Sequence, residues 1–232
     1  MPDVQRPATL AKVYEAARKK IEAGDVPTLM VTAPQALYRW IDPSKLPRPK
    51  TGTPVLKVQA NRLLVPSGNP QNRFSGPSGD PPNPGIPAAS GLYCVLQQQA
   101  LVNEASHYTR KAQVWALAGQ CVLRIRIRGM IMVADLSPHN PGAMRFLREL
   151  GPKTWDEMTD TKDCSVARGI GLAIAQSSYL HGLSVETVRE SARSAEERGD
   201  NMVLYGSAMH NLDVDQAWYF GKTSQPEVYP VV

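Results

Sequence analysis

The stretch AQVWALAGQCVLRIRIRGMIMVADLS, residues 112–137, decides the fold class of this 232-residue chain. Between Val122 and Ile127 apolar side chains alternate with arginines, which is the pattern of a strand that buries one face. The stretch is also rich in β-branched residues, which strands favour. We therefore expect two or three strands here.

An amphipathic helix is predicted at the start of the chain, in TLAKVYEAARKKIEAGD. It begins with Thr9 as its N-cap and ends at Gly24. Its apolar face consists of Leu10, Val13, Tyr14, Ala17 and Ile21.

Three further helices are expected. Two cover residues 97–110 and 142–150. The third is a second amphipathic helix in CSVARGIGLAIAQSSYLHG, with Val166, Ile170 and Ile174 on one face and Gly182 after its end.

Short strands are expected elsewhere. LMVTAPQALYRWIDPSKLP contains a strand-like piece and then an extended segment broken by Pro. TPVLKVQANRLLVP is predicted to form one strand or a hairpin, GLYCVL a strand from Gly91, and MVLYG a final strand after the charged residues 186–201. Helices and strands alternate without a strict βαβ rhythm, so the fold class is α+β.

Composition favours one globular domain. The 42% hydrophobic and 20% charged content is ordinary, and the formal net charge of +5 favours anionic partners without choosing among them. The three cysteines and four histidines are dispersed, so we expect no disulfide framework and no metal site. With no signal peptide and no membrane-spanning run, the expected location is the cytoplasm, or a target cell reached by a signal-independent secretion route.

Glu104 is the most informative single residue. Leu101, Glu104, Ala105 and Tyr108 share one stripe of the predicted helix, so the carboxylate lies beside apolar residues. Such a carboxylate must be paired, face a cleft, or extend from the edge of the stripe to water or to Arg110.

Two arginines have neighbours that suit anion binding. Arg39 lies among aromatic residues in LYRWID, beside Tyr38, where a guanidinium can stack and bind a phosphate or form a structural ion pair. Arg73 precedes Phe74 inside GNPQNRFSGPSGDPPNPG, a stretch whose composition is that of a linker or an irregular loop. The glycines near Arg73 would let backbone N–H groups approach an anion.

Other polar residues give weaker indications. Ser191 and Ser194 lie in a charged stretch with no nucleophile signature. Arg124, Arg126 and Arg128 alternate with isoleucine, which predicts a solvent-facing strand face or, less favourably, an RNA-binding face.

Taken in order, these residues resemble the RES domain of bacterial toxin–antitoxin pairs, over about Gln35 to Gly206. The most specific part is a Tyr followed eleven residues later by a helix Glu, here Tyr93 and Glu104. The matching segments are LYRWID, NRFSGPSG, GLYCVLQQQALVNEASHY, MVADLS, CSVARGIGLAIA and ESARSAEERGDNMVLYG.

The resemblance implies an ADP-ribosyltransferase-like fold and NAD⁺ as substrate rather than a bound cofactor. It implies a catalytic domain over 31–232 with a helical extension over 1–30, in one domain overall. Glu104, Arg73 and Ser191 would be catalytic, with Ser194 competing for the serine role. Arg39, Tyr38, Arg73 and Tyr93 would bind NAD⁺.

The implied reaction needs a single carboxylate. Cleavage of the nicotinamide–ribose bond passes through an oxocarbenium-like state, and nicotinamide departs neutral without a general acid. Glu104 would hold the ribose hydroxyl and stabilise the developing charge. The two arginines would bind the pyrophosphate, Tyr93 would pack beside nicotinamide, and Ser191 would orient the substrate.

Several alternatives stay open. The acceptor can be water, phosphate or a macromolecule, and the last would make the protein an ADP-ribosyltransferase. The other readings are an RNA-binding or RNA-cleaving toxin and an interaction domain without catalysis. The resemblance implies a cognate antitoxin or immunity protein. We expect no membrane partner and no direct DNA binding.

A domain boundary in the Gly/Pro stretch would split the site, so we expect an active-site loop there, anchored at Arg73, with an insertion over residues 77–87.

Overall fold

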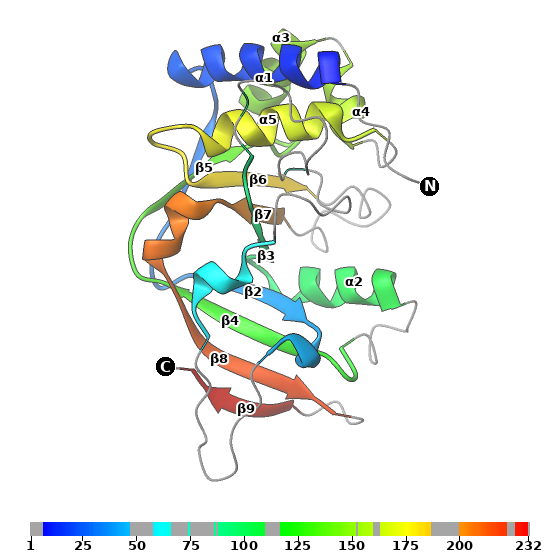
Figure 1. Cartoon of the computed structure of the whole chain (residues 1–232), viewed down its shortest axis with the longest axis vertical. Helices are drawn as coiled ribbons and strands as arrows, with labels where there is room; N and C mark the ends of the chain where they lie inside the picture. Colours follow the sequence, from blue (N-terminus) through cyan, green and yellow to red (C-terminus); the bar gives the residue numbers. More distant parts are fainter. Residues whose placement is uncertain are drawn as a thin grey trace.

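The computed structural model describes residues 7–46, 58–65, 74, 86, 88–109, 117–151, 153–159, 163–186, 200–221 and 226–231. In this part of the chain, strands form a mixed sheet and helices cover one of its faces (Figure 1). The fold is therefore α+β, as expected from the sequence.

The sheet has the strand order β1-β5-β6-β7-β3-β2-β4-β8-β9. Neighbouring strands are antiparallel except β5 and β6, which are parallel. The strands are β1 (Thr28–Val31), β2 (Ala36–Ile41), β3 (Leu92–Val95), β4 (Cys121–Ile127), β5 (Ile131–Asp135), β6 (Gly182–Glu186), β7 (Asp200–Leu204), β8 (Leu212–Phe220) and β9 (Pro226–Pro230).

Two groups of helices cover one face of the sheet. The helices α1 (Pro7–Glu22), α3 (Pro141–Leu150), α4 (Thr154–Thr159) and α5 (Ser165–Ala175) form one group, and α2 (Gln98–Thr109) lies apart from them (Figure 1). The 3₁₀ turns η2 (Ala60–Leu63) and η5 (Gly206–Asn211) pack on the opposite face. A further 3₁₀ turn, η1 (Pro43–Lys45), follows β2.

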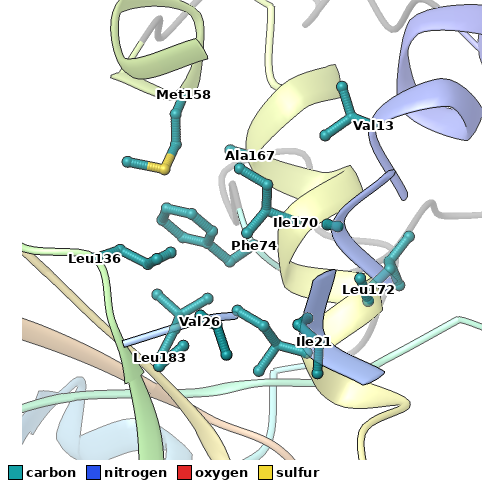
Figure 2. Close-up of a cluster of buried hydrophobic side chains, with 14 of the residues drawn as sticks. Val13, Ile21, Val26, Phe74, Leu136, Met158, Ala167, Ile170, Leu172 and Leu183 are labelled. Carbon is teal, nitrogen blue, oxygen red and sulfur yellow. The ribbon is translucent and has the colours of Figure 1, made fainter. Parts of the chain in front are cut away.

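The main core lies between the four helices and strands β5, β6 and β7. Its helical side includes the predicted apolar face of α1, which is buried from Leu10 to Ile21. Its sheet side includes Leu183 and Val203. Phe74 also belongs to this core, and Figure 2 shows its ring among Met158, Leu136 and residues of α5. A long-range contact thus fixes one residue of the Gly/Pro stretch in the centre of the helical layer.

A much smaller core lies under α2, which we call the α2 core. Its buried members are Val95, Ala100, Leu101 and Val122. Partly buried aromatic side chains border it: Tyr38, Trp40, Trp218 and Phe220. The opposite face of the sheet carries a third cluster, the outer core, which includes Leu37, Leu123 and Met202.

Most predicted elements are confirmed. The helices over residues 7–22, 98–109 and 141–150 and the strand from Leu92 are confirmed. The N-cap prediction was wrong, because the first helix begins at Pro7 and Thr9 lies inside it. The stretch around residues 121–135 forms two strands, β4 and β5, but they lie in different parts of the sheet and pair with other strands.

The predicted helix after residue 164 was wrong in extent and character. α5 ends at Ala175, and Gly182 begins β6 instead of following the helix. Every residue from Ser165 to Ile174 is buried, so α5 has no solvent-facing side. It lies under α1, where Gly169 leaves no room for a Cβ because the Leu10 carbonyl oxygen would lie 2.9 Å from it.

Two strand predictions also need correction. The described part of TPVLKVQANRLLVP forms the turn η2, because Ala60 and Leu63 are buried at the three-residue spacing of a 3₁₀ turn. The strand over residues 200–204 is not the last, because β8 and β9 follow it. β9 begins and ends with proline and lies at one edge of the sheet. No described helix is long and apolar enough to cross a membrane.

Candidate functional site

Strand β3 lies between the part of the sheet covered by α1, α3, α4 and α5 and the part covered by α2. It is flanked by β7 on one side and β2 on the other. Tyr93 and Val95 project from the same face of β3, because they are two residues apart. Tyr93 packs against the main core and Val95 belongs to the α2 core. Tyr93 therefore lies at the junction between the two groups of helices.

Arg39 and Tyr38 project from opposite faces of β2. Tyr38 borders the α2 core, and its ring lies 5.9 Å from the Trp218 ring. Leu37, on the same side of the strand as Arg39, belongs to the outer core. The side chains of Tyr38 and Arg39, both predicted to bind NAD⁺, therefore leave β2 on different sides of the sheet.

The Arg39 guanidinium reaches from β2 to β3. These two strands share a single register pair, Tyr38 with Val95. Beyond that pair, Arg39 Nη1 donates a hydrogen bond to the Tyr93 carbonyl oxygen at 3.3 Å. A side chain therefore links the strands beyond the point where their backbone pairing ends.

Two tyrosines hold the backbone of Phe74. The Phe74 N–H donates to the Tyr93 hydroxyl oxygen at 3.1 Å. The Tyr205 hydroxyl donates to the Phe74 carbonyl oxygen at 3.0 Å. Phe74 follows Arg73 in the sequence, so the residue next to the second predicted arginine contacts Tyr93, as Arg39 does.

Helix α5 closes over this contact at Gly171. A Cβ at this position would collide with the Phe74 carbonyl oxygen and would lie 2.7 Å from the Tyr205 hydroxyl. Glycine is required here by close backbone approach. Burial, with a smaller contribution from Tyr93, raises the pKa of Tyr205 well above its usual value, so this hydroxyl stays protonated as a donor.

Glu104 lies in the middle of α2, and its side chain is outside the described part of the chain. The helix is held on the sheet by Ala100 and Leu101, which pack with Val95. Ala105 is fully buried as well. Position 104 follows Leu101 by three residues and precedes Ala105, and the predicted place of the Glu104 carboxylate on this stripe stays a prediction. Arg73, Ser191 and Ser194 lie outside the described residues altogether.

Arg124 and Arg126 of β4, and Arg128 directly after it, pair with aspartates on β8. Arg126 and Arg128 are exposed, and Arg124 is half-buried. Arg126 and Arg128 both bind the Asp213 carboxylate, with N–O distances of 2.9 and 2.6 Å. Arg124 Nη1 lies 3.4 Å from Asp215 Oδ2. The prediction of a solvent-facing strand face is confirmed for Arg126 and Arg128. The ion pairs offset much of the positive charge that an RNA-binding face would need.

Phe74, Tyr205 and Gly171 were not predicted as parts of the site. The sequence does contain a signal for Phe74, because it is an aromatic residue within a Gly/Pro stretch. The sequence contains no such signal for Tyr205 or Gly171, because their contact with Phe74 joins three segments that are distant in the chain.

Among the described residues, no three His, Cys, Asp or Glu side chains lie together as metal ligands. The cysteines Cys94, Cys121 and Cys164 are all buried and form no disulfide. Comparison with protein-family models, curated proteins and solved structures found no match. Inferences about chemistry therefore depend on the residues of the site.

Proposed function

We propose that this protein cleaves the nicotinamide–ribose bond of NAD⁺, with water or phosphate as the acceptor. The observation that carries the proposal is the convergence on Tyr93. Arg39 binds its carbonyl oxygen, and the residue after Arg73 binds its hydroxyl. Three segments of the RES resemblance, separated by up to 54 residues, therefore contact or include one residue, with Arg39 at the backbone of Tyr93 and Phe74 at the end of its side chain.

The connection from β3 to α2 supports a nearby carboxylate. Two residues separate the end of β3 at Val95 from the start of α2 at Gln98. Glu104 is six residues further, about 9 Å along the helix. The α2 core packs the helix against β3 and β4, so position 104 is on the same face of the sheet as the Tyr93 side chain.

The reaction balances with one enzyme carboxylate. The bond between ribose C1 and the nicotinamide ring nitrogen breaks, and its electron pair neutralises that nitrogen. Water then gives ADP-ribose and a proton, and phosphate gives ADP-ribose 1-phosphate. Glu104 would bind a ribose hydroxyl and stabilise the positive charge on the sugar. Arg39 and Arg73 would bind the pyrophosphate.

Tyr93 has two functions in this proposal. Its hydroxyl holds the Phe74 amide, and its ring would form the wall beside nicotinamide. Tyr38 would contribute from the α2 face, and Ser191 would orient the substrate, with Ser194 as the other serine that could do so. We further propose that the sheet and its helices are an ADP-ribosyltransferase-like arrangement, and that a protein antitoxin or immunity partner neutralises the enzyme.

Product analysis tests the proposal. Purified protein is incubated with NAD⁺, with and without phosphate, and nicotinamide and the ADP-ribose products are separated by chromatography. We expect Glu104→Gln to reduce NAD⁺ consumption at least about 100-fold, because the transition-state charge loses its carboxylate. The control is Glu157→Gln, which alters an exposed helix carboxylate on α4 and should leave the rate unchanged.

Consumption of NAD⁺ by folded Glu104→Gln protein at the wild-type rate would contradict the mechanism. Labelled NAD⁺ separates the acceptors: transfer of the label to a protein or nucleic acid would identify a transferase. Salt-dependent RNA binding without any loss of NAD⁺ would favour the RNA reading instead.

A further inference from the structure

We propose that Tyr205 is a positioning residue: together with Tyr93 it clamps the backbone of Phe74, the residue bonded to Arg73. The effect on NAD⁺ binding rests on the function proposed above. The clamp itself rests on contacts among described residues.

The two tyrosines are well placed to hold one residue from both sides. In the register of β3 with β7, Tyr93 pairs with Val203, so Tyr205 is a diagonal neighbour on the same face. Their hydroxyls bind different groups of Phe74, one the N–H and the other the carbonyl oxygen. Both backbone polar groups of Phe74 are thus held by side chains of the sheet.

Two further contacts make the clamp rigid. The Phe74 ring is buried in the main core with 6% of its surface exposed, which prevents the residue from sliding. On the other side, α5 approaches so closely at Gly171 that a methyl group would not fit. Phe74 is therefore held by its ring, its N–H and its carbonyl oxygen, and it is covered by a helix.

The flanking sequence gives this clamp its consequence. Arg73 directly precedes Phe74, and the Phe74 N–H that binds the Tyr93 hydroxyl belongs to the peptide bond between these two residues. An arginine that binds a pyrophosphate must be held in advance, or part of the binding free energy is lost in ordering it. Because Arg73 is bonded to Phe74, the two tyrosines supply this ordering from the sheet.

The first measurement concerns the clamp alone. Hydrogen exchange of the Phe74 amide, followed by mass spectrometry of peptides covering this segment, is compared in wild type, Tyr205→Phe and Tyr93→Phe. We expect at least about tenfold faster exchange in both variants, because the amide loses its acceptor or its fixed geometry. Unchanged exchange in both would overturn the clamp, whether or not the protein cleaves NAD⁺.

The second measurement concerns positioning. For Tyr205→Phe we expect the KM for NAD⁺ to rise about tenfold while kcat stays within about twofold of wild type. This is the result expected when the substrate and the transition state lose the same amount of binding free energy. In an Arg73→Gln background the same substitution should leave KM unchanged, because the arginine to be positioned is gone. A tenfold KM effect that persists in that background would overturn the positioning role.

Tyr179→Phe is the matched control. The Tyr179 hydroxyl also donates to a backbone carbonyl, that of Ile21 at 2.9 Å, but far from Phe74 in the chain. This variant loses the same kind of hydrogen bond, so Phe74 exchange and KM should match wild type. If it changed Phe74 exchange as much as Tyr205→Phe, general loosening would explain the result and the clamp would be refuted.

Discussion

The two parts of the helical layer differ sharply in depth. Over β5, β6 and β7, four helices enclose a main core in which α5 is buried on every side. Over β2 and β4, α2 rests on an α2 core with four fully buried residues among those described. Tyr93 and Val95 of β3 belong to one part each, so the candidate site spans a deep and a shallow region.

This difference suggests a division of tasks. The deep part holds the backbone of Phe74, the residue that follows Arg73, through Tyr205 and α5. The shallow part carries Glu104 on α2, whose described buried residues are Ala100, Leu101 and Ala105. Under the proposed function, pyrophosphate binding would depend on the deep region, and Glu104 would be on an element that can adjust more easily.

The largest expected effect tests the depth of the two cores. Ile170→Ala in α5 should lower the free energy of unfolding by about 4 kcal/mol, because a cavity remains in a closely packed site. Leu101→Ala in α2 should cost about 2 kcal/mol, because a thin layer relaxes around the missing side chain. Urea unfolding of both variants measures the difference. A loss for Leu101→Ala equal to that for Ile170→Ala would refute the comparison.

An intermediate effect is expected where α5 touches Phe74. Gly171→Ala should destabilise the protein by about 2 kcal/mol, since the new methyl group meets a backbone carbonyl that cannot easily move. Gly206→Ala is the matched control, because nothing lies within 4 Å of a Cβ there. Thermal unfolding should show a lower Tm for the first variant and little change for the second. Equal Tm values would show that α5 can shift away from Phe74.

The smallest effect concerns Asp213 at the exposed end of the shallow part. Burial alone would raise the pKa of Asp213, but hydrogen bonds from Arg128 and Arg126 outweigh it and lower the pKa below its usual value. The contribution to stability is therefore present above about pH 4 and lost as the pH falls below it. Between pH 6 and 3, wild type should lose about 0.5 kcal/mol more than Asp213→Asn, and salt should shrink this difference. A larger acid loss in the variant would show the opposite sign.

The predictable part of the fold is local. The alternation in β4 and the apolar stripe of α1 depend on neighbouring residues, and both were found. β8 was missed although it begins with alternating residues, because the extra residue Asp215 interrupts the register opposite Arg124 and Ile125. β6 was missed because it is short and carries a buried polar residue, Ser184.

The site was predictable to a smaller extent. Arg39 was selected from its aromatic neighbours and Tyr93 from the RES resemblance, and the structure brings the two residues into contact. The hydroxyl of Tyr205 could not be selected, because its partner is 131 residues away and no local pattern marks such a pair. Pairing of residues across the fold is a property of the tertiary structure.

The prolines of β9 limit how the sheet can grow. Val231 donates its N–H to the Asp215 carbonyl oxygen, so the odd-numbered residues of this strand face β8 and the backbone of Pro226, Val228 and Pro230 faces outward. Proline has no N–H, so Val228 supplies the one outward donor of this strand. Although Val228 is apolar and 55% exposed, a strand from another molecule would find too few hydrogen bonds to pair here. This edge is protected against aggregation by its own sequence.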